Sequence, residues 1–226
     1  MDKKYPMQIC QDDNLTRKFR ELHKELVNKI ISFCKENNIS IDEFHLNADG
    51  VDGSIPYGAI IKNGQLVWYH SGGSGGLIGF TKDHKMWLTS DAPDVAIQNG
   101  MMEAVEFGPN LIVNGKTAKI HGDGGWGRAP RSVIAQRKDG VVLFLIIEGR
   151  LPGYSTGATM NDIIEILLRY KAYNAANLDG GASSTMSVEG KLWNRPSAGA
   201  EYGGRTVSNA WIVTNTQGKP AQAPKK

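Results

Sequence analysis

The chain has 226 residues, of which 40% are hydrophobic and 22% are charged, which is enough for one domain with its own core and short for two. Its net charge is +3, from 26 Lys and Arg against 23 Asp and Glu, and this near balance argues against a nucleic-acid polymer as partner, which needs a concentrated basic face. No apolar run approaches the roughly 18–20 residues of a membrane span.

The first 45 residues predict a long helix followed by a strand. Over residues 14–37 apolar side chains recur every three or four positions, as on one face of an amphipathic helix. We interpret this helix as packed on the sheet of its own domain, with binding of a partner as the alternative. The N-terminus leads into no apolar segment, and a free thiol at Cys34 fits a reducing compartment. A cytoplasmic or phage-encoded protein is expected, or an extracellular one if a leader has been removed.

Turn residues then predict a series of hairpins. Asn63-Gly64 and Asn114-Gly115 each favour a type I′ turn beside short apolar runs, and Lys138-Asp139-Gly140 lies between two more such runs. The run 142–147 is apolar on both faces, which predicts a central strand covered on both sides. Further strands are expected over residues 174–178, 185–188 and 207–213.

A second clear helix is predicted before the most informative loop of the chain. Thr159 can cap it, and its buried face is expected to consist of Ile163, Ile164, Leu167 and Leu168. The predicted fold class is therefore α+β, a single domain over residues 1–213 with a mostly antiparallel or mixed β-sheet built from hairpins, a long N-terminal helix within residues 1–45 and this second helix. The tail 214–226 is rich in Pro and Lys and is expected to be disordered.

The segment Asn177-Leu178-Asp179-Gly180-Gly181 carries the strongest chemical signal. A strand would deliver Asp179 to a sheet edge, where two glycines let backbone N–H groups approach an anion closely. Hydroxyl groups follow at once, at Ser183, Ser184 and Thr185. An acidic side chain beside such a turn suits hydrolysis of a phosphate-bearing substrate.

Three arginines are placed where they could join this loop. Arg131, Arg150 and Arg205 lie near predicted strand ends, so that together they could line a phosphate pocket. Two glycine-rich stretches, 71–76 and 122–127, lack the Gly-Lys-Ser/Thr ending of a P-loop. We interpret both as surface loops that border a site, with a phosphate-cradling role as the alternative.

From residue 131 to residue 213 the sequence resembles the phosphodiester glycosidase family. That family has an arginine-led strand, a Gly-x-Thr helix start, an Asn-Leu-Asp-Gly-Gly loop, and later Asn-x-Pro-Ser and Arg-x-Val-x-Asn segments. The matching segments of this chain follow in the same order at 131–134, 157–159, 177–185, 194–197 and 205–209. Three departures stand out: Ala182 replaces a glycine, Glu148 stands where Asp is usual, and Asn47-Ala48-Asp49-Gly50 lacks the family's Phe-Phe pair.

The resemblance implies hydrolysis of the bond between a sugar anomeric carbon and a phosphodiester, with a small-molecule or polymeric sugar phosphate as partner. It makes Asp179 and Glu148 the candidate catalytic pair, whose separation would distinguish retention, at about 5 Å, from inversion, at about 6.5–9.5 Å. The expected substrate-binding residues are Arg131, Arg205, Asn177, Gly180, Gly181, Ser183, Ser184, Thr185 and Asn47.

Several alternatives stay open from the sequence. No cofactor is evident from the sequence, but oxygen ligands such as Asp49 or Asp179 could hold Ca²⁺ or Mg²⁺, whereas the scattered histidines argue against zinc. A carbohydrate- or nucleotide-binding module without turnover is one rival function. A serine hydrolase using Ser183 or Ser184 is another, although the sequence Gly-x-Ser-x-Gly is lacking there. The oligomeric state does not follow from these patterns.

Overall fold

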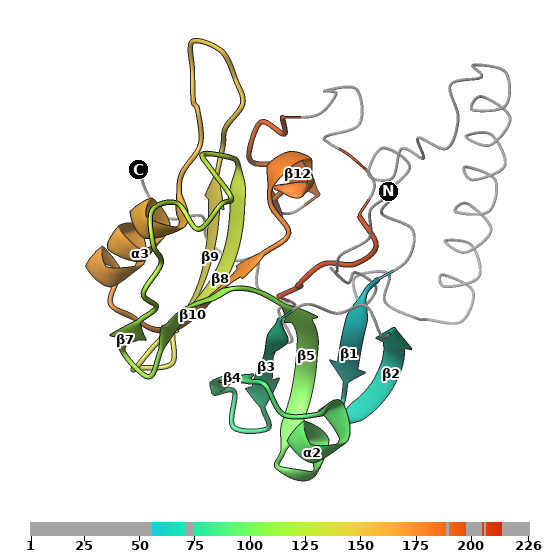
Figure 1. Cartoon of the computed structure of the whole chain (residues 1–226). Helices are drawn as coiled ribbons and strands as arrows, with labels where there is room; N and C mark the ends of the chain where they lie inside the picture. Colours follow the sequence, from blue (N-terminus) through green and yellow to red (C-terminus); the bar gives the residue numbers. More distant parts are fainter. Residues whose placement is uncertain (1–55, 71–74, 189, 198–204, 206, 214–226) are drawn as a thin grey trace, which may run out of the picture.

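The computed structural model describes residues 56–70, 75–188, 190–197, 205 and 207–213, and two five-stranded antiparallel sheets dominate it (Figure 1). The first sheet, in the order β2-β1-β5-β3-β4, consists of β1 (Gly58–Lys62), β2 (Gln65–His70), β3 (Gly76–Thr81), β4 (Met86–Thr89) and β5 (Met101–Phe107). The second sheet, in the order β7-β6-β10-β8-β9, consists of β6 (Asn110–Val113), β7 (Lys116–Thr117), β8 (Arg131–Arg137), β9 (Val142–Ile147) and β10 (Ala172–Leu178). The remaining elements are α2 (Pro93–Gln98), α3 (Met160–Arg169), a 3₁₀ turn (Gly181–Ser183), β11 (Ser187–Val188) and β12 (Lys191–Leu192).

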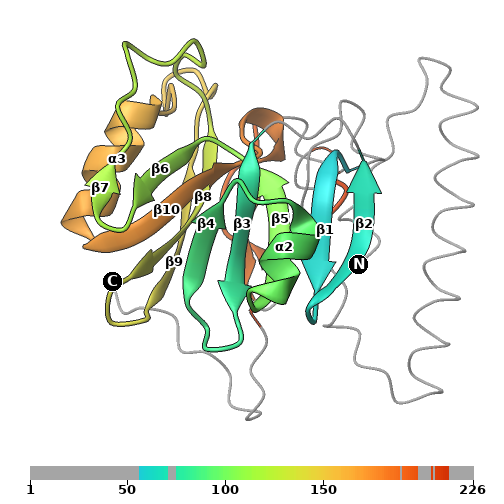
Figure 2. The same cartoon turned by 60° about the horizontal axis from the view of Figure 1, so that its bottom comes forward.

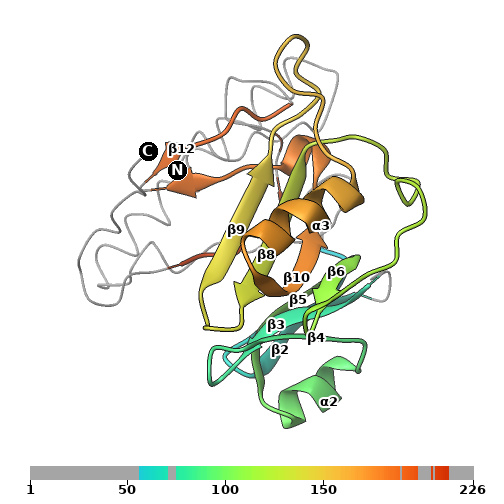
Figure 3. The same cartoon turned by 90° about the vertical axis from the view of Figure 1, so that its left-hand side faces the viewer.

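The two sheets pack face to face between the two helices. Helix α2 covers the outer face of the first sheet (Figure 2), and α3 covers the outer face of the second (Figure 3). Successive side chains of a strand point to opposite faces, so β10 sends Ala175 into the core under α3 and Ala176 into the core between the sheets. The core between the sheets joins Ile78, Met86, Leu88 and Val105 to Ile134, Ala176 and Leu178.

Local sequence explains the turns and the start of α3. Asn63 and Gly64 have φ angles of 52° and 70°, and Asn114 and Gly115 adopt similar values, so both central residues of each turn have the positive φ that a type I′ turn requires. Thr159 caps α3 through its side chain, which accepts the Asp162 N–H at 3.2 Å, while the Asp162 carboxylate accepts the Thr159 N–H at 2.8 Å. This reciprocal capping box satisfies two N–H groups at the helix start.

The expected α+β class is confirmed, since the strands of the described residues pair antiparallel and two helices flank the sheets. The prediction that 142–147 is a central, doubly covered strand is wrong. β9 is an edge strand with Val142 37% and Phe144 38% exposed, and β8 and β10 hold the central positions. The apolar run misleads because the hairpin places β9 on one side of β8, while β10, arriving from α3, takes the other.

Two further expectations are corrected near the C-terminal end. No strand forms over 207–213; Trp211 instead packs edge-on against Phe80 at 5.6 Å between ring centroids, so side-chain packing anchors this segment. Leu168 is 48% exposed, and Met160 takes its place on the buried face of α3. Strands β3 to β5 and the short helix α2 were not predicted.

Some expectations concern residues outside the described part of the chain. These are the helix over 14–37, the strand after it, Asn47, the two cysteines and the tail 214–226. The domain limits at 1 and 213 stay predictions. Within the described residues, no helix combines the length and apolar character needed to cross a membrane.

Candidate active site

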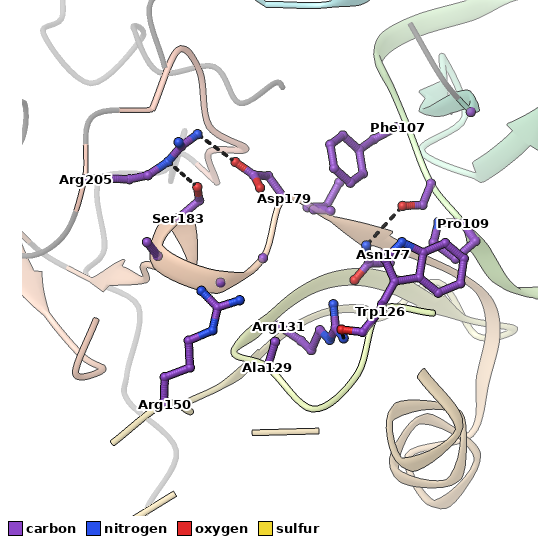
Figure 4. A pocket seen from close by; sticks show the side chains of 16 residues that line it. Phe107, Pro109, Trp126, Ala129, Arg131, Arg150, Asn177, Asp179, Ser183 and Arg205 are labelled. Carbon is purple, nitrogen blue, oxygen red and sulfur yellow. Dashed lines mark hydrogen bonds and ion pairs between the residues drawn. The ribbon is translucent and has the colours of Figure 1, made fainter. Parts of the chain in front are cut away.

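A cleft opens at one end of the strands of the second sheet, where β8 begins and β9 and β10 end. Antiparallel pairing sets Arg131 opposite Ile147 and Ser132 opposite Leu178, so segments distant in sequence meet at this edge. The cleft has a volume of about 740 Å³. Its walls include Phe107, Pro109, Trp126, Arg131, Arg150, Asn177, Asp179, Ser183 and Arg205 (Figure 4).

The chain turns sharply along the cleft directly after β10. A Cβ atom on Gly180 would lie 2.8 Å from the carbonyl oxygen of Pro130. Gly181, with φ of 59°, donates its N–H to that same oxygen at 2.8 Å. Glycine suits both positions because it has no Cβ atom and adopts positive φ without strain. The Gly181 N–H is used inside the protein, although the residue itself lines the cleft.

Arg205 connects the acidic and hydroxyl side chains of this turn. Its Nε donates to Ser183 Oγ at 2.7 Å, and its Nη2 lies 3.4 Å from Asp179 Oδ2. Ser183 is buried, whereas Asp179 retains part of its exposure on the cleft wall. These contacts hold the carboxylate in a defined orientation beside a cation, in a position where a bound molecule could meet it.

Arg131 lies buried beneath the cleft and hydrogen-bonds backbone carbonyl groups. Its Nε donates to Ala158 O at 3.1 Å, and its Nη2 donates to the carbonyl oxygens of Trp126 and Gly127 at 3.1 and 2.7 Å. Burial, and next the nearby Arg150 charge, lower the pKa of Arg131 from its ordinary value, against a smaller opposing effect of Asp123. A guanidinium stays protonated despite such a shift, so Arg131 adds positive charge under the cleft. Its hydrogen bonds also hold the segment Trp126-Gly127 in place.

Arg150 differs from the other two arginines because its guanidinium makes no hydrogen bond or ion pair with any described residue. It lines the cleft next to the glycine turn, and a Cβ on Gly181 would lie 3.2 Å from its Nη1 (Figure 4). Its backbone has φ of 56°, a left-handed conformation that a residue other than glycine, Asn or Asp seldom adopts. An exposed, unpaired cation held in this way is suited to binding an anion.

The opposite wall of the cleft is largely apolar. Phe107, Pro109 and Trp126 face Arg150 and Arg205 across it (Figure 4), and Trp126 is 49% exposed. Asn177, which is 5% exposed, donates from Nδ2 to Gly108 O at 3.0 Å, and its buried Oδ1 has no hydrogen-bond partner among the described residues. Sequence reasoning missed the three apolar wall residues; the one available signal was a tryptophan within the glycine-rich stretch 122–127.

Other residues expected at the site lie away from the cleft walls. The Glu148 carboxylate accepts the Arg195 N–H at 2.6 Å and does not line the cleft. Ser184 is buried, and its hydroxyl lies 3.2 Å from Ser132 Oγ, while Thr185 is exposed outside the cleft lining. Asn47 lies outside the described residues. The structure therefore brings together Arg131, Arg205, Asn177, Asp179, Gly180, Gly181 and Ser183.

The donor groups at the cleft bear on the alternatives left open by the sequence. Within the described residues, no group of three or more His, Cys, Asp or Glu side chains is arranged to hold a metal ion. The cleft also has no histidine among its described lining residues, and Ser183 contacts Arg205 rather than a base. A serine nucleophile would need such a base, so the geometry gives that alternative no support.

Comparison with protein families gives one match that covers most of the chain. The family model described as phosphodiester glycosidase matches residues 37–214. Among curated proteins, an uncharacterised protein derived from the SPbeta prophage of Bacillus subtilis, YomE, is 35% identical over 114 residues. That alignment covers 48% of this chain and 17% of the prophage protein.

A solved structure has a similar fold. The catalytic domain of zebrafish N-acetylglucosamine-1-phosphodiester alpha-N-acetylglucosaminidase, auto-inhibited by its pro-peptide, aligns with a TM-score of 0.58 and 21% identity. The alignment covers 72% of this chain and 59% of the zebrafish chain. A hypothetical protein from Synechocystis aligns with a TM-score of 0.38 and 21% identity, over 62% of this chain and 30% of its own. This chain thus spans only part of the length of each relative.

Proposed function

The chain belongs to the phosphodiester glycosidase family, and on this premise we propose that it hydrolyses the glycosidic bond of a sugar-1-phosphodiester. The observation that carries the proposal is the unpaired guanidinium of Arg150, which shares one cleft with the carboxylate of Asp179. A substrate that joins a phosphate to a sugar ring would place a negative group and a reactive anomeric carbon in such a cleft.

The phosphate would bind on the arginine side. Arg150 and Arg205 line the cleft, and Arg131 adds its charge from below. Against these three cations the described lining residues include one carboxylate, Asp179, so the cleft carries excess positive charge. Guanidinium groups match the oxygen geometry of a phosphate and form charge-assisted hydrogen bonds with it.

The sugar would bind toward the apolar wall. The exposed indole of Trp126 offers a flat face for the apolar side of a pyranose ring, and Phe107 and Pro109 extend that wall.

Asp179 would carry the chemistry at the anomeric carbon. In hydrolysis the bond from C1 to the phosphate oxygen breaks, its electron pair stays on that oxygen, and water supplies a hydroxyl to C1 and a proton to the products. Asp179 either takes the proton from the attacking water, or attacks C1 itself to form a glycosyl ester that water then hydrolyses, which frees the sugar and the carboxylate. A phosphate leaving group is stabilised by arginine charges as it departs, so one carboxylate can suffice. The configuration of the released sugar distinguishes the two routes.

The proposal is tested by Asp179→Asn, assayed with a UDP-sugar and with a simple sugar-1-phosphodiester. Loss of the carboxylate is expected to lower kcat by about 10²–10⁴-fold while binding is largely kept. Asp139→Asn is the matched control, since Asp139 lies in the β8–β9 turn at the opposite end of β8 from Arg131. Equal turnover in the two variants would remove Asp179 from the mechanism. Tight binding by a wild-type protein that releases no sugar would instead favour a binding module.

A further inference from the structure

The position of Arg150 needs support from its surroundings. The residue is exposed, has a left-handed backbone and has no polar partner of its own among the described residues. Long charged side chains lose considerable conformational entropy when they are ordered. Their placement is therefore determined largely by the backbone that carries them.

The loop that carries Arg150 is closed on itself. Ser155 Oγ donates to Glu148 O at 2.6 Å, and Leu151 and Ser155 exchange backbone hydrogen bonds of 2.9 and 3.0 Å. Gly157 donates its N–H to Ser155 Oγ at 3.2 Å. Arg150 sits at the neck of this loop, between Glu148 and Leu151, so movement of the loop as a whole would move the guanidinium.

Glu148 joins this loop to a second segment. Its Oε1 accepts the Arg195 N–H at 2.6 Å. Its carboxylate also accepts a hydrogen bond from the Tyr154 hydroxyl, which, with the Glu148 charge, raises the pKa of Tyr154. The Arg195 guanidinium lies over the Tyr154 ring, 4.6 Å from its centroid. Three side chains thus connect the loop 148–157 to Arg195.

Asn194 continues the connection to the turn that bears Asp179. Its Oδ1 accepts the Met186 N–H at 2.7 Å, and its Nδ2 donates to Ser184 O at 2.8 Å. Asn194 is the first residue of the Asn-x-Pro-Ser segment, which has no part in the chemical steps of the proposed reaction. A continuous set of contacts therefore runs from the Arg150 loop through Glu148, Arg195 and Asn194 to the glycine turn.

We infer that Glu148 and Asn194 form a clasp that sets the distance between the Arg150 guanidinium and the turn bearing Asp179. This inference rests on the proposed function and changes the expected role of Glu148, which becomes a positioning residue rather than a member of a catalytic pair. Its carboxylate is engaged by Arg195 and Tyr154 and does not line the cleft. The clasp acts on phosphate binding through Arg150.

Two substitutions at position 148 separate a positioning from a catalytic role. Glu148→Gln keeps an oxygen that can accept the Arg195 N–H, so phosphate affinity and kcat are expected to stay within about threefold of the wild type. Glu148→Ala removes the clasp and is expected to weaken binding of inorganic phosphate by about tenfold, the loss of one charge-assisted hydrogen bond, and to raise KM more than it lowers kcat. A loss of about 10²-fold or more in kcat for Glu148→Gln would overturn the inference in favour of catalysis.

A double-mutant cycle tests whether the clasp acts through Arg150. In an Arg150→Ala background, Glu148→Ala and Asn194→Ala are each expected to have no further effect on the affinity for inorganic phosphate. Glu165→Ala, an exposed glutamate on α3, is the control. Additive losses in the cycle would show that the clasp is merely structural and overturn the inference. Because phosphate binding is measured by calorimetry without turnover, an inactive wild type would refute the proposed reaction while these outcomes still decide on the clasp.

Discussion

Replacement of Arg150 by asparagine should separate ligand binding from stability. Arg150 has φ of 56° and no polar partner among the described residues. Asparagine tolerates the left-handed conformation better than arginine does. The variant Arg150→Asn therefore removes the charge, and its backbone conformation is at least as favourable energetically as in the wild type.

The expected magnitudes follow from these two facts. Loss of a charge-assisted hydrogen bond costs about 1.5–3 kcal/mol, so the affinity for inorganic phosphate or a sugar-1-phosphate should fall by about 10–150-fold. A left-handed residue other than glycine costs about 1–2 kcal/mol, part of which asparagine recovers. The free energy of unfolding should therefore stay unchanged or rise by less than about 1 kcal/mol, a shift in Tm of at most about 2–4 °C for a chain of this size.

Lys171→Asn provides a matched control. Lys171 also has positive φ, 60°, and is exposed, but it follows α3 at the end of β10 opposite to Asp179. Both variants lose one positive charge from a residue with left-handed backbone. Calorimetric titration should therefore show a lower phosphate affinity for Arg150→Asn than for Lys171→Asn, whereas thermal unfolding should show similar Tm values for the two. Equal phosphate affinity in the two variants would refute the assignment of Arg150 to the anion site, and a large loss of stability in Arg150→Asn would refute its description as unpaired.

Two further predictions concern stability and are measured by urea unfolding. Gly157→Ala should lower the free energy of unfolding by more than about 3 kcal/mol, because the added Cβ would lie 2.3 Å from the carbonyl carbon of Ala129. Gly153→Ala, with open space around the added Cβ, should lower it only by the left-handed strain of about 1–2 kcal/mol. Similar losses in the two variants would contradict the role of this close approach. Hydrogen bonding to the Thr159 backbone N–H, and next to the Thr159 side chain, lowers the pKa of Asp162. The stability advantage of wild type over Asp162→Asn should therefore be complete at neutral pH, where the carboxylate is ionised in both the folded and the unfolded state. It should decline as pH falls below about 4. An advantage that does not change between pH 7 and pH 2.5 would contradict this coupling.

The predictable features of the fold were those determined by neighbouring residues. Asn63-Gly64 identified a turn because both residues tolerate positive φ, and Thr159 identified a helix start because its hydroxyl can accept a nearby N–H. Strand order depends instead on where the chain returns after a helix, which no local pattern records. For that reason the apolar run of β9 was assigned to the centre of a sheet and not to its edge.

The site divides in the same way. Asp179 and Arg205 were found from motifs, and they do line one cleft with Arg131. Arg131 donates its hydrogen bonds to backbone carbonyl groups, whereas Arg150 makes no such bonds with the described residues. This difference depends on the course of the chain around 126–127 and 148–157. The contacts of Glu148 with Arg195 were equally beyond a sequence pattern, since 47 positions separate the two residues.

The division of the cleft between strand ends and connections affects how it can change over evolution. Arg131 and Asn177 belong to paired central strands, so substitutions there disturb the sheet as well as the ligand. Trp126 and Pro109 lie in connections, where sequence can diverge at little cost to folding. Related proteins could therefore acquire new sugar preferences through the apolar wall while the anion-holding side stays constant, and divergence in substrate would concentrate on one side of the cleft.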